Sequence, residues 1–507
     1  MLTTRLFFLF SLALLLAACG SGRMSYSPQK KFSPEKLQQD FSVFRQTLEE
    51  AHPGLYWYTP VDSMNYYFNQ GAAQLTDSMT EPAFRKILSY ITAKINCGHT
   101  TVRSSKRYAG FSDTVRIRRL FPLSLKIWEE GAVVSANINL RDSVLTRGTP
   151  VLAINGVPIM QIVDSLCQFL STDGYNNTHK YQVLSNRGYF GSMYSSVYGY
   201  PEHYAITFLD SNNQPGKIIL KPFVPVRDTT RKQGPPPPRA PKPGRRERKT
   251  IRRQAVRLLK IDSTDKVAMM DLNSFGRGYG LKRFFRHSFR ALRKNDIKHL
   301  IIDVRSNGGG SVTNSTLLTR FIADQPFRVA DSLYAPVKRK KYSRYVQHDF
   351  FNRLFITFFT RKKKDGNYHF RYYQRHLFKP RTKNHYKGKT YILIGGNSFS
   401  ATTLFAGTVR EQENVLVIGE ETGGGAYGNS AWLIPDVTLP NTKVRFRLPL
   451  FRLVIDKKLP HNGRGIQPEI FSGPTRNDIR LGKDYKLEKA LELIRQDRLP
   501  ETTTHQP

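Results

Sequence analysis

Cysteine is scarce in this sequence, with three residues among 507. Cys19 ends the N-terminal leader, which leaves Cys97 and Cys167 for the folded part. A disulfide framework is therefore excluded as the main source of stability, and a buried core has to supply it. Hydrophobic residues make up 39% of the chain, enough for the two to four domains that this length suggests.

Acidic residues are also few, with 39 Asp and Glu against 79 Lys and Arg and a formal net charge of +40. In an exported protein such a charge favours anionic lipid, lipopolysaccharide or cell-wall polymers as partners, and no nucleic-acid partner is expected. A generally basic composition without a dedicated partner explains the charge equally well.

The apolar run at the N-terminus, Leu6 to Leu16, is shorter than the about 20 residues that a membrane span needs. It follows Arg5 and is typical of a signal peptide. Leu16-Ala17-Ala18-Cys19 resembles a bacterial lipobox, which implies removal of residues 1–19 and lipid attachment at Cys19; the alternative is an ordinary signal with a chance cysteine. We therefore expect a cell-envelope protein, lipid-anchored to the outer membrane and facing the periplasm.

The region 20–112 is expected to hold a polar tether and an N-terminal helical domain. Ser33-Pro34-Glu35 opens a helical pattern, with Ser33 as a cap, and His52-Pro53-Gly54 ends it. A second helical stretch, Phe84 to Ile95, leads into Gly98-His99-Thr100, where glycine ends the helix. This region is thus predicted to present His99 on a turn.

Short apolar strands dominate residues 113–222, and Asn155-Gly156 predicts a tight turn between two of them. This β-rich region resembles PDZ domains, which implies that it binds polypeptide C-termini as an added strand. Residues 223–253, with Gly234 to Pro238 and many arginines, are predicted to form an extended, solvated linker.

Apolar runs alternate with helical patterns over residues 254–480, which predicts an α/β core, followed by a C-terminal helix and tail at 481–507. An insertion at 326–389 interrupts this core and is rich in basic and aromatic residues. Its segment Asp349 to Thr360 is apolar enough to lie on a membrane surface or to cover a substrate groove. An insertion simply packed on the core is the leading alternative, and export disfavours base stacking.

Two segments of the core carry the chemistry. Gly395 to Thr402 lies between a buried strand and a helix, a turn that suits an activated serine at Ser400, although small residues there are more often helix caps. Ile301 to Gly310 is a strand that opens into a glycine cluster, where backbone amides can converge on negative charge. The Gly-Lys-Ser/Thr ending of a phosphate-binding loop is missing from it.

Four ordered segments resemble peptidase family S41, the C-terminal processing or tail-specific peptidases. They are Asp303 to Gly310, Ser398-Phe399-Ser400-Ala401-Thr402, Gly419 to Gly425, and Gly463 to Glu469. The resemblance implies an α/β fold with a crotonase/ClpP-like ββα core, Ser400 as nucleophile, and the backbone amides of Gly309 and Ala401 as the oxyanion hole.

The sequence departs from this family at the base. Gly425 stands where the processing peptidases have a lysine, so a Ser–Lys dyad is excluded. Gly98-His99-Thr100 is similar to the histidine turn of the tricorn-like branch, which implies His99 as the base; an imidazole can serve at neutral pH. The glutamate that would orient it is absent from His461-Asn462-Gly463, which leaves the orienting residue open. Cys97 as a thiol nucleophile is disfavoured because no suitable hole lies nearby.

These observations predict a serine-type endopeptidase that cleaves envelope or periplasmic polypeptides through an acyl-enzyme on Ser400, without a metal or other cofactor. Its partners are polypeptide substrates, including their C-termini, and a membrane reached through the lipid anchor. The alternative is a catalytically inactive peptide-binding lipoprotein of the same fold. An adhesin for envelope polymers is a third class. The sequence does not specify the oligomeric state.

Overall fold

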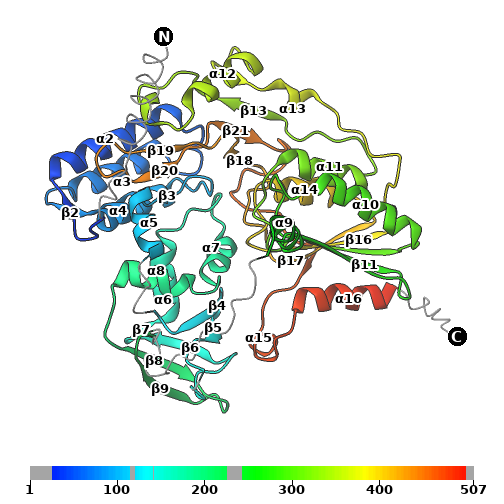
Figure 1. Ribbon diagram of the computed structural model, residues 1–507, viewed down its shortest axis with the longest axis horizontal. Helices are drawn as coiled ribbons and strands as arrows, with labels where there is room; N and C mark the ends of the chain where they lie inside the picture. Colours follow the sequence, from blue (N-terminus) through cyan, green and yellow to red (C-terminus); the bar gives the residue numbers. More distant parts are fainter. Residues whose placement is uncertain (1–25, 115–119, 141, 225–242, 498–507) are drawn as a thin grey trace, which may run out of the picture.

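The computed structural model describes residues 26–114, 120–140, 142–224 and 243–497 (Figure 1). The leader with Cys19 and the proline-rich stretch Gly234 to Pro238 lie outside the described residues, so the expectations for them stay predictions. Within the described ranges, no helix has the length and apolarity needed to cross a membrane.

A six-stranded sheet forms the centre of the catalytic half, in the order β10-β11-β12-β16-β17-β22. Its strands are parallel except for β10 at one edge. The strands are β10 (Arg257–Asp262), β11 (Val267–Leu272), β12 (His299–Asp303), β16 (Lys389–Ile394), β17 (Val415–Gly419) and β22 (Ile470–Phe471). The middle strands are buried on both faces, as the continuous apolar runs indicated.

Helices cover both faces of this sheet (Figure 1). One face carries α10 (Leu281–Lys294), α11 (Val312–Ile322) and α14 (Ala401–Val409). The other carries α16 (Tyr485–Asp497), preceded by the short α15 (Arg476–Leu481). The α/β prediction is therefore confirmed.

The parallel register brings two chain segments to one edge of the sheet. Asp303 at the end of β12 pairs with Leu393 near the end of β16. The chain leaves both strands at their carboxyl ends, so residues 304–310 and 395–400 emerge side by side. Ligand and active sites of α/β sheets occupy this edge.

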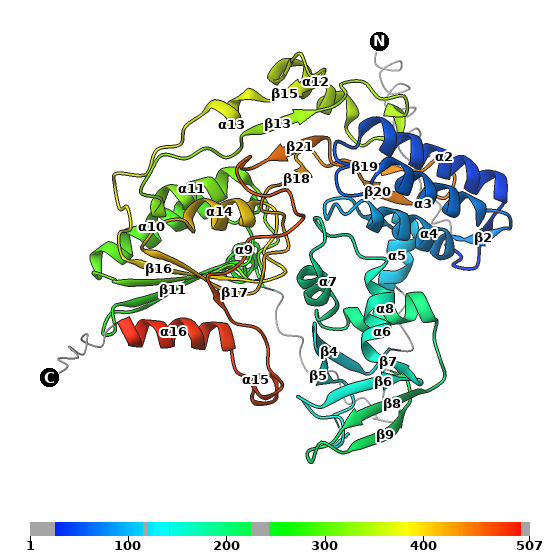
Figure 2. The same cartoon turned by 180° about the vertical axis from the view of Figure 1, so that it is seen from behind.

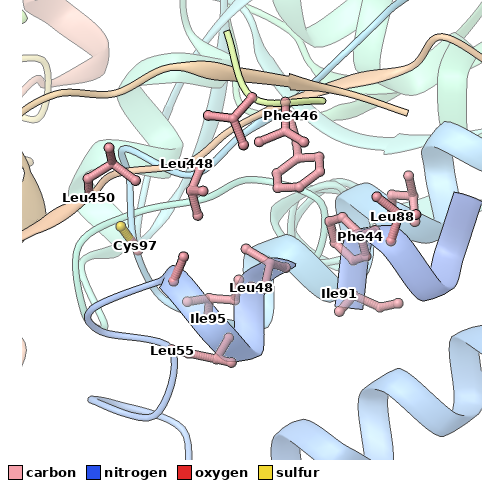
Figure 3. Packing of buried hydrophobic residues seen from close by; sticks show 14 of the residues in the cluster. Phe44, Leu48, Leu55, Leu88, Ile91, Ile95, Cys97, Phe446, Leu448 and Leu450 are labelled. Atoms are coloured by element: carbon pink, nitrogen blue, oxygen red, sulfur yellow. The ribbon is translucent and has the colours of Figure 1, made fainter. Parts of the chain in front are cut away.

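The N-terminal helices share a core with strands from the far end of the sequence. Phe44 packs edge to face on Phe446, with ring centroids 5.0 Å apart, and Figure 3 shows Cys97 facing Leu450 in the same cluster. The elements are α2 (Pro34–Ala51), α3 (Val61–Ala73), α4 (Glu81–Lys94), α5 (Lys106–Thr114), β1 (Lys31–Phe32), β2 (Met79–Thr80), β3 (Val102–Arg103), β19 (Asp436–Thr438) and β20 (Arg445–Arg447). Because β3 pairs with β20, the turn before β3 is held against the catalytic half. Ser33 occupies the N-cap position of α2 without a side-chain cap bond.

The insertion 326–389 is part of a five-stranded antiparallel sheet, in the order β14-β15-β13-β21-β18. Its own elements are β13 (Ser332–Ala335), the 3-10 turn Ser343–Tyr345, α12 (Asp349–Phe359), β14 (Arg361–Lys362), β15 (Tyr368–His369) and α13 (Arg371–Arg375), and the core adds β18 (Gly428–Ala431) and β21 (Phe451–Val454). Figures 1 and 2 both place α12 at the outer rim of the molecule. The insertion is thus packed on the core through β13 and β21.

The β-rich region forms an antiparallel sheet with three helices and its own core. Its elements are β4 (Leu123–Trp128), β5 (Gly131–Asn137), β6 (Pro150–Ile154), β7 (Val157–Pro158), β8 (Tyr204–Leu209), β9 (Pro215–Leu220), α6 (Ile159–Cys167), α7 (Asn177–Leu184) and α8 (Tyr189–Tyr198). Ile154 pairs with Val157 across Asn155 and Gly156, both at positive φ, which confirms the tight turn. A PDZ-like role for this region stays a prediction.

One linker prediction is wrong. An extended loop was expected up to residue 253, but residues Arg245–Gln254 form the helix α9, none of whose side chains is buried. The segment is rich in arginine, lysine, glutamate and glutamine, which have high helix propensity, and the prolines stop before it. Composition that excludes a packed core does not exclude a solvated helix.

Candidate active site

Ser400 occupies a strained turn between β16 and α14. Its backbone has φ 58° and ψ −118°, a region that side-chain-bearing residues rarely adopt, and such strain marks functional positions. Ser400 precedes the first residue of α14, yet its side chain makes no cap bond to the helix. The helix-cap alternative for Ser400 is therefore wrong, and the half-buried hydroxyl is left to face a cavity.

Ser398, two residues earlier, has a structural role instead. Its buried hydroxyl donates to the carbonyl oxygen of Val304 at 2.8 Å and accepts from the Gly395 amide at 3.2 Å. It thereby ties the segment after β12 to the segment after β16. Of the two serines in this turn, only Ser400 contributes to the cavity lining among the described residues.

Gly309 allows the glycine cluster to touch the Ser400 turn. A Cβ on Gly309 would lie 2.6 Å from the Phe399 carbonyl oxygen and 2.8 Å from the Ser400 Cβ, and φ is +92°. Glycine is therefore required for this approach. Its amide donates to Asn307 Oδ1 at 2.9 Å, however, so it has to leave that bond before it can meet an oxyanion. Ala401 begins α14, at a helix N-terminus where amides have no partner within the helix.

His99 reaches the same cavity through Gly98. A Cβ on Gly98 would lie 2.4 Å from the Phe399 ring, so glycine lets the two turns meet. The His99 ring then packs on Phe399 with centroids 5.0 Å apart, and His99 and Ser400 both line the cavity. The predicted base and nucleophile, distant in sequence, are thus brought to one site.

His52 holds the His99 turn from behind. Its Nδ1 accepts the Gly54 amide at 3.2 Å, so its Nε2 carries the proton and donates to Thr100 Oγ1 at 2.7 Å. Burial, with a smaller contribution from the Arg452 charge, lowers the pKa of His52 to about 3 and keeps it neutral. The His52-Pro53-Gly54 motif therefore supports the neighbour of the predicted base.

Asp173 is the site residue that the sequence pattern did not indicate. It lies between α6 and α7, and its carboxylate accepts the Gly98 amide at 2.8 Å and the Gly425 amide at 3.4 Å. Its Oδ1 is 3.9 Å from His99 Nδ1, a buried nitrogen without a hydrogen-bond partner among the described residues. Asp173-Gly174 predicts a turn, but nothing in the sequence links that turn to His99.

The segment in which relatives are expected to carry a glutamate that orients the histidine lies next to Asp173. The Tyr175 amide donates to the Gly463 carbonyl oxygen at 3.0 Å, and a Cβ on Gly174 would lie 2.3 Å from the same oxygen. The stretch His461 to Gly463, where a glutamate was sought, therefore packs on the segment that carries Asp173. The carboxylate near His99, that of Asp173, therefore comes from a different region of the chain than the closing motif.

Burial determines the protonation of the pair. It lowers the pKa of His99 to about 3, with smaller contributions from the Arg447 and His179 charges, so the imidazole is neutral and able to accept a proton. Burial raises the pKa of Asp173 to about 7, against the two amide hydrogen bonds that lower it. Above pH 7 the site holds a neutral imidazole beside a carboxylate.

Cys97 is a protonated thiol. Burial and the nearby Asp173 charge raise its pKa to about 11, and its sulfur lies 3.7 Å from the Ser430 carbonyl oxygen. This disfavours the thiol-nucleophile alternative. Ligand atoms of Cys97, His99 and Asp173 lie within 4.8 Å of one another, so they are able to hold a soft divalent cation.

The remaining motif residues hold the site together. Glu421 accepts the Gly465 amide at 2.6 Å, and Arg305 donates through Nε to Asp303 Oδ1 at 3.0 Å. A Cβ on Gly425 would lie 2.6 Å from the Gly428 carbonyl oxygen, so a lysine does not fit there without a backbone shift. No lysine is among the described residues that line the cavity.

The cavity at Ser400 has a volume of about 1000 Å³ and a largely aromatic wall. Four side chains of this wall belong to the insertion, and the remaining wall side chains follow β18 or lie on α14. They are Phe355, Phe370, Tyr372, Tyr373, Leu404, Trp432, Leu433 and Ile434. The insertion therefore lines the cavity beside Ser400, with Phe355 coming from its apolar segment Asp349 to Thr360. Arg277 and Arg447 add positive charge to the lining.

Comparison with known proteins identifies a family and a fold. Residues 266–471 match the model of peptidase family S41. Mature CPAF complexed with lactacystin has 12% sequence identity and a TM-score of 0.61, covering 92% of this chain and 98% of that chain. Another structure of mature CPAF has 14% sequence identity and a TM-score of 0.61, covering 92% of this chain and 99% of that chain. The photosystem II D1 C-terminal processing protease has 12% sequence identity and a TM-score of 0.39, covering 89% of this chain and 98% of that chain. The CPAF structures share the fold of this chain.

Proposed function

Because the chain belongs to peptidase family S41, we propose that it is a serine endopeptidase cleaving cell-envelope polypeptides through an acyl-enzyme on Ser400. The observation that carries the proposal is the meeting of Ser400 and His99 in one cavity, although they lie in separate regions of the sequence. The strained Ser400 turn and the neutral His99 support it further. Lipid anchoring through Cys19 at the outer membrane belongs to the same proposal and rests on the sequence.

The chemistry follows from the groups around the cavity. His99 accepts the proton of the Ser400 hydroxyl while Oγ attacks the substrate carbonyl carbon, and the Ala401 amide meets the oxyanion that forms. The proton passes from His99 to the leaving amine as the C–N bond breaks. Water then attacks the ester, giving its proton to His99, which returns a proton to Ser400 Oγ as the ester C–O bond breaks and the acid product leaves. Asp173 stabilises the imidazolium in both steps.

The proposal is tested by labelling the purified chain with a fluorescent fluorophosphonate, which reacts only with an activated serine. We expect labelling of the unchanged chain and none of Ser400→Ala. Ser311→Ala is the matched control, since Ser311 also lines the cavity but starts a different helix, and it should label normally. Absence of labelling in a folded, unchanged chain would favour the inactive peptide-binding alternative.

The aromatic wall predicts a preference for large apolar side chains beside the cleaved bond. One extra or missing methylene group in such a pocket changes kcat/KM by about 10- to 200-fold. Phe370→Ala should lower kcat/KM for peptides with Phe at that position by at least about 10-fold and leave peptides with Ala nearly unchanged. Phe358→Ala is the control, because Phe358 belongs to the insertion but is exposed and is not part of the cavity lining. Equal losses for both peptides would contradict the specificity role.

A further inference from the structure

The helix α12 is oriented with its aromatic side outward. Phe350, Phe351, Phe358 and Phe359 are 57%, 66%, 75% and 60% exposed, whereas Asp349 and Asn352 are buried. A surface helix normally shows the opposite arrangement, with the apolar stripe against the core. Exposed apolar groups that gather in one place mark an interaction surface.

The orientation of α12 is locked from below. Asp349 forms a buried ion pair with Lys340 at 2.7 Å. Ile356, further along α12 on the same side of the helix, belongs to the hydrophobic core. At about 100° per residue, Phe350, Phe351 and Phe358 fall within roughly one third of the helix circumference, opposite Ile356. Rolling the helix to hide these phenylalanines would break the ion pair and expose Ile356.

Basic residues flank α12 on both sides in the sequence. Arg339, Lys341 and Arg344 precede α12, and the exposed run Arg361 to Lys364 follows it. Within the described ranges, no ion pair engages Arg361 to Lys364. The only acid in that run's turn, Asp365, accepts a hydrogen bond from His369 at 2.7 Å.

A second cavity adjoins this surface, and three of its five lining side chains are arginines. Its volume is about 640 Å³, and the lining residues are Arg361, Arg371, Tyr372, Arg375 and His376. No acidic residue is among the described side chains around it. Arginine groups that converge without a counter-ion suit a phosphate, which accepts their paired N–H donors.

We propose that α12 and this arginine cavity form a docking surface for an anionic phospholipid bilayer. The phenylalanines enter the boundary between headgroups and acyl chains, while a lipid phosphate occupies the arginine cavity and Arg361 to Lys364 meet neighbouring headgroups. An acidic protein partner would match the charges but would leave the protruding phenylalanines without a partner groove. Tyr372 lines both cavities, so docking brings the catalytic groove to the membrane surface.

Vesicle binding of the chain from residue 20 onward, which contains all described residues and no lipid, tests the proposal. We expect it to co-sediment with phosphatidylcholine vesicles containing 30% phosphatidylglycerol. Phe351→Ser with Phe358→Ser should weaken partitioning at least about 10-fold. The control, Ile219→Ser with Phe471→Ser, removes similarly exposed apolar residues elsewhere and should change it less than twofold.

The net charge of the chain requires a separate control for unspecific attraction. Arg371→Gln with Arg375→Gln should weaken binding several-fold more than Arg246→Gln with Arg248→Gln, which removes two exposed charges from α9. Equal losses would mean that net charge alone holds the chain to the vesicle and would overturn the proposal.

Insertion of α12 is measured with Phe358→Trp and lipids brominated on the acyl chains. The introduced tryptophan should be quenched by the bromine atoms and shifted to shorter wavelength, relative to the parent chain. Binding without quenching, or displacement of the vesicles by a soluble polyglutamate peptide, would indicate an acidic protein partner and overturn the membrane assignment. None of these readouts depends on peptidase activity, so they separate this surface from the proposed function.

Discussion

Ser400→Ala and His99→Ala are each expected to lower kcat by about four to six orders of magnitude, and the double variant should lose no more than either. The nucleophile without a base, and the base without a nucleophile, leave the same residual binding and oxyanion contribution. The losses therefore do not add. Steady-state cleavage of a fluorogenic peptide, with active-site titration of the unchanged chain, measures the three values.

Folding has to be separated from catalysis in these variants. His99 is buried and packs on Phe399, so His99→Ala leaves a cavity, and His99→Gln serves as a second variant that fills the space. Near-native circular dichroism and thermal unfolding, together with lost turnover, would support a catalytic pair. Turnover of His99→Gln within tenfold of the unchanged chain would contradict the assignment, as would simple addition of the two losses.

The catalytic half was predictable because its signals are local. Apolar runs without alternation indicated buried parallel strands, and parallel strands end at one edge, so the residues after Asp303 and after Ile394 had to meet. Glycine at position 309 follows from the same closeness, since a Cβ there would clash with the Ser400 turn. Motif spacing and strand direction together were sufficient for this part of the site.

Contacts between distant regions were not predictable in this way. Asp173 belongs to a turn of the β-rich region, and its approach to His99 depends on how that region packs on both the N-terminal helices and the closing motif. The hydrogen bond from the Gly309 amide to Asn307 Oδ1 also depends on the exact path of the loop. Charge composition likewise indicated a solvated segment before β10, but not that part of it is helical.

Asp173 is expected to act as the positioning residue of His99, so Asp173→Asn should lower kcat by up to about 10⁴-fold with little change in KM. Asparagine keeps an oxygen for the Gly98 amide but cannot hold the negative charge that stabilises an imidazolium, a loss of this size being typical of Ser–His–Asp sites. Asp173 is not among the described cavity-lining residues, so substrate affinity should persist. Asp164→Asn, on an exposed position of α6, is the matched control.

The pH profile distinguishes this role from a merely structural one. Because burial raises the pKa of Asp173 to about 7, the carboxyl group is neutral below that pH and ionises as pH rises through it. The pKa of His99 is lowered to about 3, so the imidazole stays neutral above about pH 4 and produces no limb of its own near neutrality. We therefore expect kcat/KM of the unchanged chain to rise with pH through about 7, and Asp173→Asn to lose this limb. An Asp173→Asn profile that keeps the limb at reduced height would assign Asp173 to the fold alone, whereas partial recovery of both rate and limb in Asp173→Glu would tie them to the carboxylate.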